Sequence, residues 1–346
     1  MKKVKAPRLR KFIHWKMIMV YLVAILCLSI VLTTAIGPVY VPPLEIVALL
    51  GSKLRLCEPS SIPHEVIIFQ IRLPRIFLGI LVGLSLATAG TALQGLFKNP
   101  MADPYIIGIA SGAAVGAALS IMVLPQIFSI YTTPIMAFLG ALFTIFLVYN
   151  IATVGGKIPV DTLLLTGIAV SLFLGAVLAF MMSIAGEALH NIFFWIMGGF
   201  WLANWTQVKI IVLPVLVCFG LIYLFAKDLN AMLLGEESAQ TLGINVETSK
   251  RILLVLSAFI TAAAVAFTGT IGFVGLIIPH ITRILVGPDH RILIPASALV
   301  GGIFLVWTDA LARLLGEMPV GIITAFFGAP FFIYLLKKRK SGYYAA

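Results

Sequence analysis

Charged residues are scarce in this sequence: they make up 11% of its 346 residues, whereas 61% of the residues are hydrophobic. A soluble globular protein carries about 25% charged and about 45–50% apolar residues, so this composition excludes that class. It also excludes a disordered chain, a collagen and a disulfide scaffold. The apolar residues fall in runs of about 20, which is the length of a helix that crosses a bilayer. The sequence therefore predicts an all-α, polytopic membrane protein.

Cysteines are equally few. Cys27, Cys57 and Cys218 are scattered and form neither a disulfide framework nor a metal-ligand pattern. The chain has no H-x-x-x-H or C-x-x-C pair, and its five histidines lie far apart, so no metal site is predicted. The G-x-x-x-x-G-K-[ST] phosphate loop is also missing, so the chain cannot bind and hydrolyse ATP by that motif. We predict a protein that is not an enzyme and has no cofactor.

Acidic residues are missing from the middle of the apolar runs, because all 13 lie in loops or near predicted helix ends. Ion-coupled transporters typically hold a proton or cation with an acid deep within a span. This absence counts against a secondary transporter driven by an ion gradient, which we keep as the alternative function. A charge at mid-bilayer costs about 2.5–3.5 kcal/mol on insertion scales, so the same pattern is also the ordinary expectation. The energy for transport must then come from another protein.

Basic residues predict the orientation of the chain. Its net charge is +11, and 7 of its 24 Lys and Arg residues fall within the first 16 positions. Four more lie together at 337–340. Basic residues beside apolar helices mark the cytoplasmic side, so this charge indicates a lipid bilayer and not nucleic acid as the partner. Both termini are predicted to be cytoplasmic.

Ten apolar runs predict ten transmembrane helices in one transmembrane domain, 1–346. They lie near 17–37, 75–97, 105–124, 134–154, 161–183, 207–226, 251–268, 273–286, 292–310 and 322–336. The eighth is short for a full span and is expected to be tilted or partly buried in protein. Pro279 within it follows a run of glycines, which predicts freed carbonyls that need protein partners. Two hydrophilic stretches are long enough to have their own structure: the outer loop 37–75 and the inner loop 227–250.

The inner loop predicts two short helices that meet at a sharp angle. Asp228 is placed to cap a first helix, which Gly235 ends. Two glutamates then begin a second helix, where acids complement the helix dipole. Gly243 supplies a left-handed stop, and Asn245 can cap the next span. A solvated connector with ordinary caps has the same signals. The apolar residues expected to be exposed are Leu233, Leu234, Ala239 and Leu242.

Four segments resemble a known family and follow one another in that family's order. The segment LGEESAQTLG, at 234–243, is similar to the coupling-helix motif of ATP-binding-cassette importer permeases. The others are RLPRIFLGILVGLSLATAGTALQGLFKNPMADPYIIGIASGAAVG at 72–116, GTIGFVGLIIPHITRILVGPDHRILIPASAL at 269–299 and EMPVGIITAFFGAPFFIYLL at 317–336. Together they resemble the permeases of type II importers that carry ferric siderophores, haem and cobalamin.

This resemblance implies a type II importer permease fold in the cytoplasmic (inner) membrane. It implies a dimer with a second permease copy, identical or a close paralogue, together with two ATPase subunits and a soluble or lipid-anchored substrate-binding protein. The cargo it implies is a metal chelate, with ferric siderophore first and haem, cobalamin or an oxyanion behind it. The residues implied in ATPase coupling are Leu234, Gly235, Glu236, Glu237, Ala239, Leu242 and Gly243.

Three arginines stand out because they lie on the predicted outer side, against the inward bias of basic residues. From the residues alone, Arg313 pairs with Asp309 four positions earlier, while Arg72 and Arg75 reach lipid phosphates at the interface. The resemblance adds a third role, in which arginines at these three positions meet glutamates of the binding protein.

The resemblance also implies that the fifth and tenth spans line a central pathway. Trp195, Gly198 and Gly199 are similar to a short outer helix of the family that lies beside this pathway. An aromatic-rich segment at this place is equally typical of an interfacial belt.

Overall fold

The computed structural model describes residues 5–53, 64–123 and 129–343. Over these residues the chain forms fourteen α-helices and no strand, which confirms the all-α class. Cys57, which was expected to behave as a small hydrophobe, lies outside the described residues. Cys218 is buried among apolar side chains as expected, whereas Cys27 is exposed.

Ten apolar helices correspond to the ten predicted spans. Seven are long and apolar enough to cross a membrane: α1 (Lys5–Ala35), α3 (Leu73–Leu96), α5 (Thr132–Ala152), α6 (Val160–Ile184), α8 (Trp205–Leu224), α11 (Val246–Thr268) and α13 (His290–Leu314). The three others have shorter apolar stretches: α4 (Ile109–Val123), α12 (Val274–Val286) and α14 (Val320–Tyr343). The eighth predicted span is therefore short, as expected, because α12 has only 13 residues.

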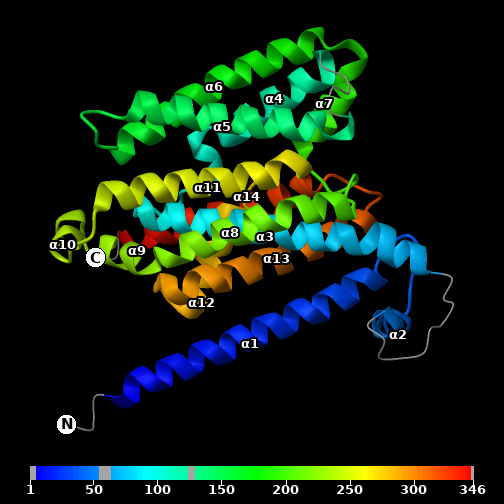
Figure 1. Cartoon of the computed structure of the whole chain (residues 1–346), viewed down its shortest axis with the longest axis horizontal. Coiled ribbons are helices and arrows are strands. Elements are labelled where there is room, and N and C mark those ends of the chain that lie inside the picture. Colours follow the sequence, from blue (N-terminus) through cyan, green and yellow to red (C-terminus); the bar gives the residue numbers. More distant parts are fainter. Residues whose placement is uncertain (1–4, 54–63, 124–128, 344–346) are drawn as a thin grey trace.

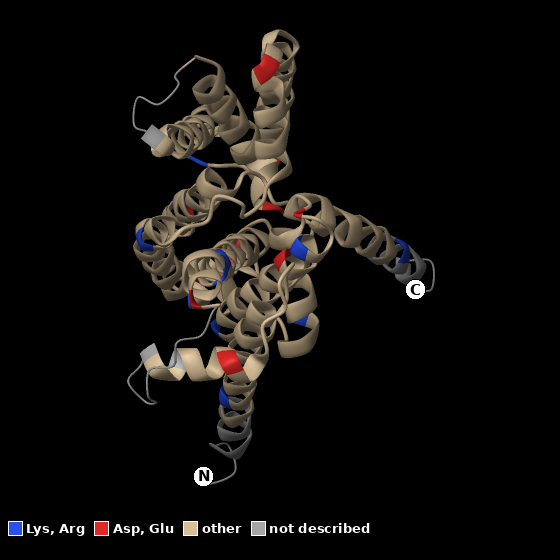
Figure 2. Cartoon of the chain, turned by 90° about the vertical axis from the view of Figure 1, so that its right-hand side faces the viewer, with Lys and Arg blue, Asp and Glu red and all other residues tan. Residues whose placement is uncertain are grey.

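Four short helices lie between these spans. They are α2 (Pro43–Lys53), α7 (Leu189–Met197), α9 (Ala226–Met232) and α10 (Glu236–Thr241). In Figure 1, α9 and α10 lie at the same end of the molecule as the start of α1 and the end of α14. The helices α2 and α7 lie at the opposite end. Both chain ends are thus on the side of the inner loop, as the basic residues predicted. Figure 2, viewed from the end that carries α2 and α7, shows that most of the ribbon carries no charged residue.

Helix α3 is the centre of the bundle. In the apolar segment that contains it, 83% of the residues are buried, compared with 17% in α1 and 22% in α6. It packs against α8, α11, α12 and α13. The helices α4 to α7 form a layer on one side of α11, and α1 lies along α13 on the other side (Figure 1).

Small residues allow α3 to approach its neighbours closely. A Cβ atom on Gly83 would lie 2.2 Å from the carbonyl oxygen of Gly301 in α13. A Cβ atom on Gly90 would lie 1.9 Å from the carbonyl oxygen of Gly275 in α12. Helices in a membrane associate through such backbone contacts because lipid offers them no hydrophobic driving force. The absence of side chains at these two positions therefore sets the spacing of the central helices.

The break between α11 and α12 is repaired by polar groups of α3. Residues 269–273 are not helical, and Pro279 cannot donate a hydrogen bond to the carbonyl of Gly275. The Gln94 amide of α3 donates instead to the carbonyl oxygens of Gly275 (3.3 Å) and Leu276 (3.0 Å). The Arg283 guanidinium donates to Gln94 Oε1 at 3.0 Å and holds the amide in this orientation. The expected need for protein partners at this proline is confirmed.

We expect Gly90→Ala to lower the thermal unfolding midpoint of the purified protein in detergent. Its Cβ atom has no space against Gly275, and overpacking a core costs about 1–3 kcal/mol. Gly220→Ala in α8 is the matched control, because no heavy atom lies within 4 Å of its Cβ position. If the two variants unfold at the same temperature, α3 and α12 do not make this contact.

Candidate coupling surface, arginine cluster and pathway

The inner loop folds into the two short helices that the sequence predicted. Gly235 and Gly243 have φ angles of +126° and +82°, which side chains other than glycine rarely tolerate. The Asn245 side chain caps α11 by accepting a hydrogen bond from the Thr248 amide at 3.1 Å. The expected capping role of Asp228 is wrong, because α9 already begins at Ala226 and has Phe225 as its N-cap. Its carboxylate lies 3.2 Å from the Ser249 hydroxyl and accepts a hydrogen bond from it.

Three leucines of this loop are exposed on the inner end of the molecule. Leu234 is 75% exposed, Leu242 67% and Leu233 41%. Ala239 was expected to be exposed with them, and this is wrong: it is fully buried where α10 packs against α9 and α11. A group of exposed leucines in a water-facing segment is typical of a protein-contact surface. We call Leu233, Leu234 and Leu242 the leucine surface.

The outer arginines are not on the surface: Arg72, Arg75 and Arg313 are 4%, 7% and 4% exposed. The expectation that these side chains are exposed at the outer face is therefore wrong, whereas their contact with a binding protein stays a prediction. Arg313 Nη2 donates to the Thr33 carbonyl at 2.9 Å, and Arg72 Nη1 donates to the Thr34 carbonyl at 2.6 Å. These carbonyls lie in the last turn of α1, where a helix leaves its acceptors unpaired. Both guanidinium groups therefore cap α1.

Arg75 forms ion pairs with two acids of the same region. Its Nε lies 2.8 Å from Asp309 Oδ1, and its Nη1 lies 2.6 Å from Glu317 Oε2. Arg313 Nε lies 3.2 Å from the other oxygen of Asp309, so the expected pair four residues apart is confirmed. Buried charges need such partners, because an unpaired charge costs several kcal/mol to desolvate. The arginine cluster (Arg72, Arg75, Asp309, Arg313, Glu317) thus connects α1, α3, α13 and the turn before α14.

The predicted short outer helix is α7, which ends at Gly198. Gly198 and Gly199 are buried where α7 meets the end of α11 and the start of α14. The Gly199 amide donates to the Thr268 carbonyl at 2.8 Å, and the Gly321 amide donates to the Gly198 carbonyl at 3.4 Å. A Cβ atom on Gly198 would lie 2.4 Å from the Thr270 carbonyl oxygen. These glycines tie three chain segments together at the outer side of the bundle.

The Trp195 side chain is half-buried and packs against a small apolar cluster from α4, α5 and α11. The neighbouring Phe193 and Phe194 rings are 46% and 37% exposed and contact each other edge to face. Exposed aromatic rings of this kind suit an interfacial belt, and buried glycines suit a packed junction. The role of Trp195, Gly198 and Gly199 beside a pathway stays a prediction.

A cavity of about 510 Å³ lies between α6, the start of α4 and the residues before α12. Its lining includes the polar groups of Asp103, Tyr105, Ser111 and Ser171. The Tyr105 hydroxyl donates to the Ile271 carbonyl at 3.1 Å and fixes the non-helical segment at the cavity wall. Burial raises the pKa of the Asp103 carboxyl to about 6. The cavity therefore combines apolar walls with a few polar groups, as small-molecule sites do.

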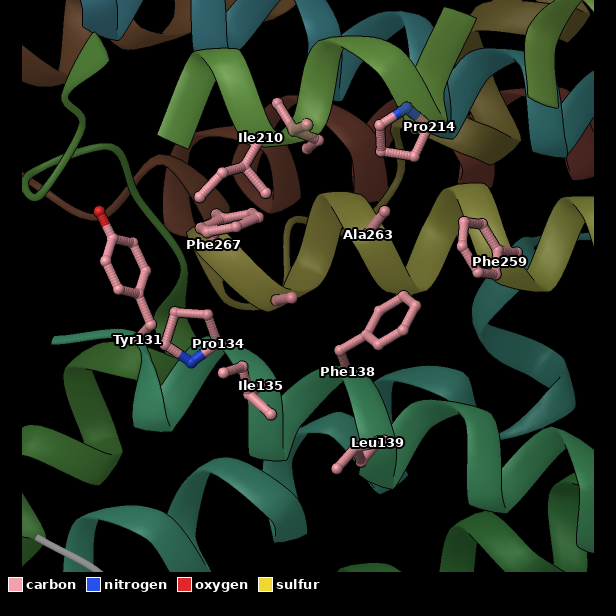
Figure 3. A pocket seen from close by; sticks show the side chains of 12 residues that line it. Tyr131, Pro134, Ile135, Phe138, Leu139, Ile210, Pro214, Phe259, Ala263 and Phe267 are labelled. Atoms are coloured by element: carbon pink, nitrogen blue, oxygen red, sulfur yellow. The ribbon is translucent and has the colours of Figure 1, made fainter. Parts of the chain in front are cut away.

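A second cavity, of about 450 Å³, lies between α5, α8 and α11 (Figure 3). Figure 3 shows apolar side chains such as Phe138, Ile210 and Phe267 around it. The Tyr131 hydroxyl is the one side-chain polar group in its described lining. Such a surface offers little to a polar cargo.

Comparison with known proteins decides the family. The model of the FecCD transport family matches residues 23–338 of this chain. The chain belongs to the FecCD transport family. It is 51% identical over 277 residues to the cobalamin import system permease protein BtuC of Halobacterium salinarum, which covers 80% of this chain and 74% of that protein. It is 40% identical over 282 residues to the hemin transport system permease protein HmuU of Yersinia pestis. This match covers 78% of this chain and 83% of that protein.

The fold of this FecCD-family chain also matches a solved structure. That structure is described as an inward-facing conformation of a metal-chelate type ABC transporter. The TM-score is 0.82 at 33% sequence identity, and the match covers 93% of this chain and 99% of the other. The type II importer permease fold expected from the sequence is thereby confirmed.

We expect Asp309→Asn to destabilise the protein strongly. It leaves two buried guanidinium groups without their shared carboxylate, and breaking a buried charge pair costs about 3–5 kcal/mol. The measurement is the yield of monodisperse protein and its thermal midpoint in detergent. Glu187→Gln, which changes an exposed acid at the same end of the molecule, is the control. Equal stability of both variants would contradict a structural role for the cluster.

Proposed function

We propose that the chain is the membrane subunit of a binding-protein-dependent importer for a metal chelate, powered by a separate ATPase. The observation that carries this proposal is the leucine surface, just after the ends of α9 and α10, in a FecCD-family chain that has no phosphate loop of its own. Exposed leucines at the ends of two short helices offer an apolar contact surface to another protein. An ATPase bound there can displace these helices when it hydrolyses ATP. Each of the two ATPase subunits binds the leucine surface of one permease copy.

The second permease copy fits against α14 and α6. Figure 2 shows α14 projecting from the body of the molecule. Its exposed residues include Phe326 (73%), Phe327 (54%) and Ile333 (64%). A second copy, identical or a close paralogue, covers this apolar face and encloses the pathway between the two permeases. The complex lies in the cytoplasmic membrane, with the binding protein at the end that carries α2 and α7.

The proposed cargo is a cobalamin-type chelate. Support comes from the higher identity with the cobalamin permease than with the hemin permease. Ferric siderophore, which the sequence analysis ranked first, and haem remain the alternative cargoes. A bulky chelate also suits a pathway that forms between two copies, because five cavities among the described residues of one copy have volumes of about 300–510 Å³.

The pairing of a buried acid in α13 counts against the alternative of an ion-driven secondary transporter. Asp309 is 1% exposed, but Arg75 and Arg313 already neutralise it. The two guanidinium groups occupy both oxygens of this carboxylate and so compete with a cation for them. The family membership points to an ATPase-driven importer as well.

We expect ATP-dependent uptake in proteoliposomes that contain the permease, its ATPase and the loaded binding protein. Cobalamin, haemin and a ferric siderophore are supplied in turn, each with its own binding protein. Uptake of cobalamin that requires ATP and persists when ionophores collapse the ion gradients supports the proposal. Uptake that stops with an ionophore and continues without ATP would show a secondary transporter. ATP-dependent uptake of one of the other chelates alone would change the cargo and leave the mechanism intact.

A further inference from the structure

A buried lysine lies behind the leucine surface. Lys250, in the second turn of α11, is 5% exposed. Its ammonium nitrogen lies 2.8 Å from Glu236 Oε2 in α10 and 3.2 Å from Glu247 Oε1 in α11. Lysine is almost never buried unless it is paired, so the two carboxylates determine its position. Lys250 therefore fixes the first turn of α10 to α11.

The second oxygen of Glu247 continues this chain of contacts. Glu247 Oε2 accepts a hydrogen bond from the Ile158 amide at 3.1 Å, and the Ile158 side chain is buried. Ile158 lies two residues before α6, in the turn that joins it to α5. That turn is closed by reciprocal backbone hydrogen bonds between Val154 and Lys157, of 3.0 and 3.1 Å. Glu247 thus contacts the turn at the inner end of α6 through a backbone amide.

Packing contacts also join these elements, because α11 packs against α5 and α5 packs against α6. α10 packs mainly against α9 and α11, while α6 packs mainly against α4 and α5. The series Glu236–Lys250–Glu247–Ile158 brings together residues of α10, α11 and the α5–α6 turn. Hydrogen bonds between charged groups are about twice as strong as neutral ones, and here the lysine is buried while both glutamates are partly exposed. The contact between Arg251 and the Tyr149 ring, 6.0 Å from its centroid, adds a second link between α11 and α5.

We propose that Lys250 and Glu247 are positioning residues that transmit movement of α10 to the α5–α6 turn and so to the inner end of α6. This inference rests on the proposed function, in which α10 contacts the ATPase. Breaking these contacts should leave the ATPase bound and active, but ATP hydrolysis should no longer be coupled to transport. It should therefore lower the amount of cargo carried for each ATP hydrolysed.

The test compares variants in the complete reconstituted importer. Lys250→Met removes the charge, Lys250→Arg retains it, and Lys157→Met removes an exposed lysine of the α5–α6 turn as the matched control. Coupling free energies between sites typically correspond to about 5- to 150-fold. We expect Lys250→Met to lower cargo transported per ATP by about fivefold or more, with ATPase binding and basal hydrolysis unchanged. Lys250→Arg should recover part of the loss, and Lys157→Met should behave as the unmodified protein does.

A distance measurement keeps the proposal testable if Lys250→Met does not assemble. Spin labels at Ser238→Cys in α10 and Lys157→Cys in the turn report whether the two segments move together. With Lys250 and Glu247 in place, the distance distribution should be narrow and should not change when ATP is added. Glu247→Gln should broaden it and lower transport per ATP. An unchanged distribution and an unchanged ratio in Glu247→Gln would overturn the relay.

The outcomes also separate this inference from the proposed function. If the unmodified complex shows no ATP-dependent uptake, the proposed function fails. If it shows uptake and both Lys250→Met and Glu247→Gln transport normally per ATP, the relay alone is wrong.

Discussion

The close approach of α3 to α12 and α13 is the constraint on which the rest of the structure depends. At Gly83 and Gly90 the backbone of α3 contacts the backbones of its neighbours, and α3 lies in the most buried of the seven long apolar segments. Helix α12 has only 13 residues, and residues 269–273 before it are not helical. Gln94 then supplies the hydrogen bonds that Pro279 takes away. Arg283 orients the Gln94 amide, so these two polar groups compensate for the hydrogen bond that the proline cannot make.

Buried charge occurs at both ends of the bundle, and it has a different consequence at each. At the outer end, Arg72, Arg75 and Arg313 hold α1, α3 and α13 together through carbonyls and shared acids. Because this cluster makes so many hydrogen bonds and ion pairs, we expect the outer ends of these three helices to keep their relative positions while other parts move. At the inner end, Lys250 and Glu247 join a small exposed helix to the start of a span. A single series of contacts of that kind is suited to passing on a displacement.

The sequence predicted the spans and the loop glycines because both follow from local rules: about 20 apolar residues per span, and glycine where φ is positive. It did not predict the depth of the arginines, since a bias in loop charge indicates the side of the membrane and not burial. Ala239 was misplaced because a helix of six residues is too short for its faces to be assigned by periodicity. The Ile158–Glu247 contact joins positions 89 apart, and no spacing rule reveals it; only the pair Glu247 and Lys250, three apart, carried a local signal.

The central claim is that the inner end of this bundle, and not the outer end, receives energy from an ATPase. Cross-linking from single cysteines tests it directly, in a chain whose three native cysteines have been replaced. Leu234→Cys places the reactive group between α9 and α10, at a leucine that is 75% exposed. Leu202→Cys places it just after α7, at a leucine that is 79% exposed. The helices α9 and α10 lie at the opposite end of the molecule from α7. The structure predicts a cross-link to the ATPase from position 234 and none from position 202. A cross-link from position 202, or from neither position in a complex that transports, would contradict the account.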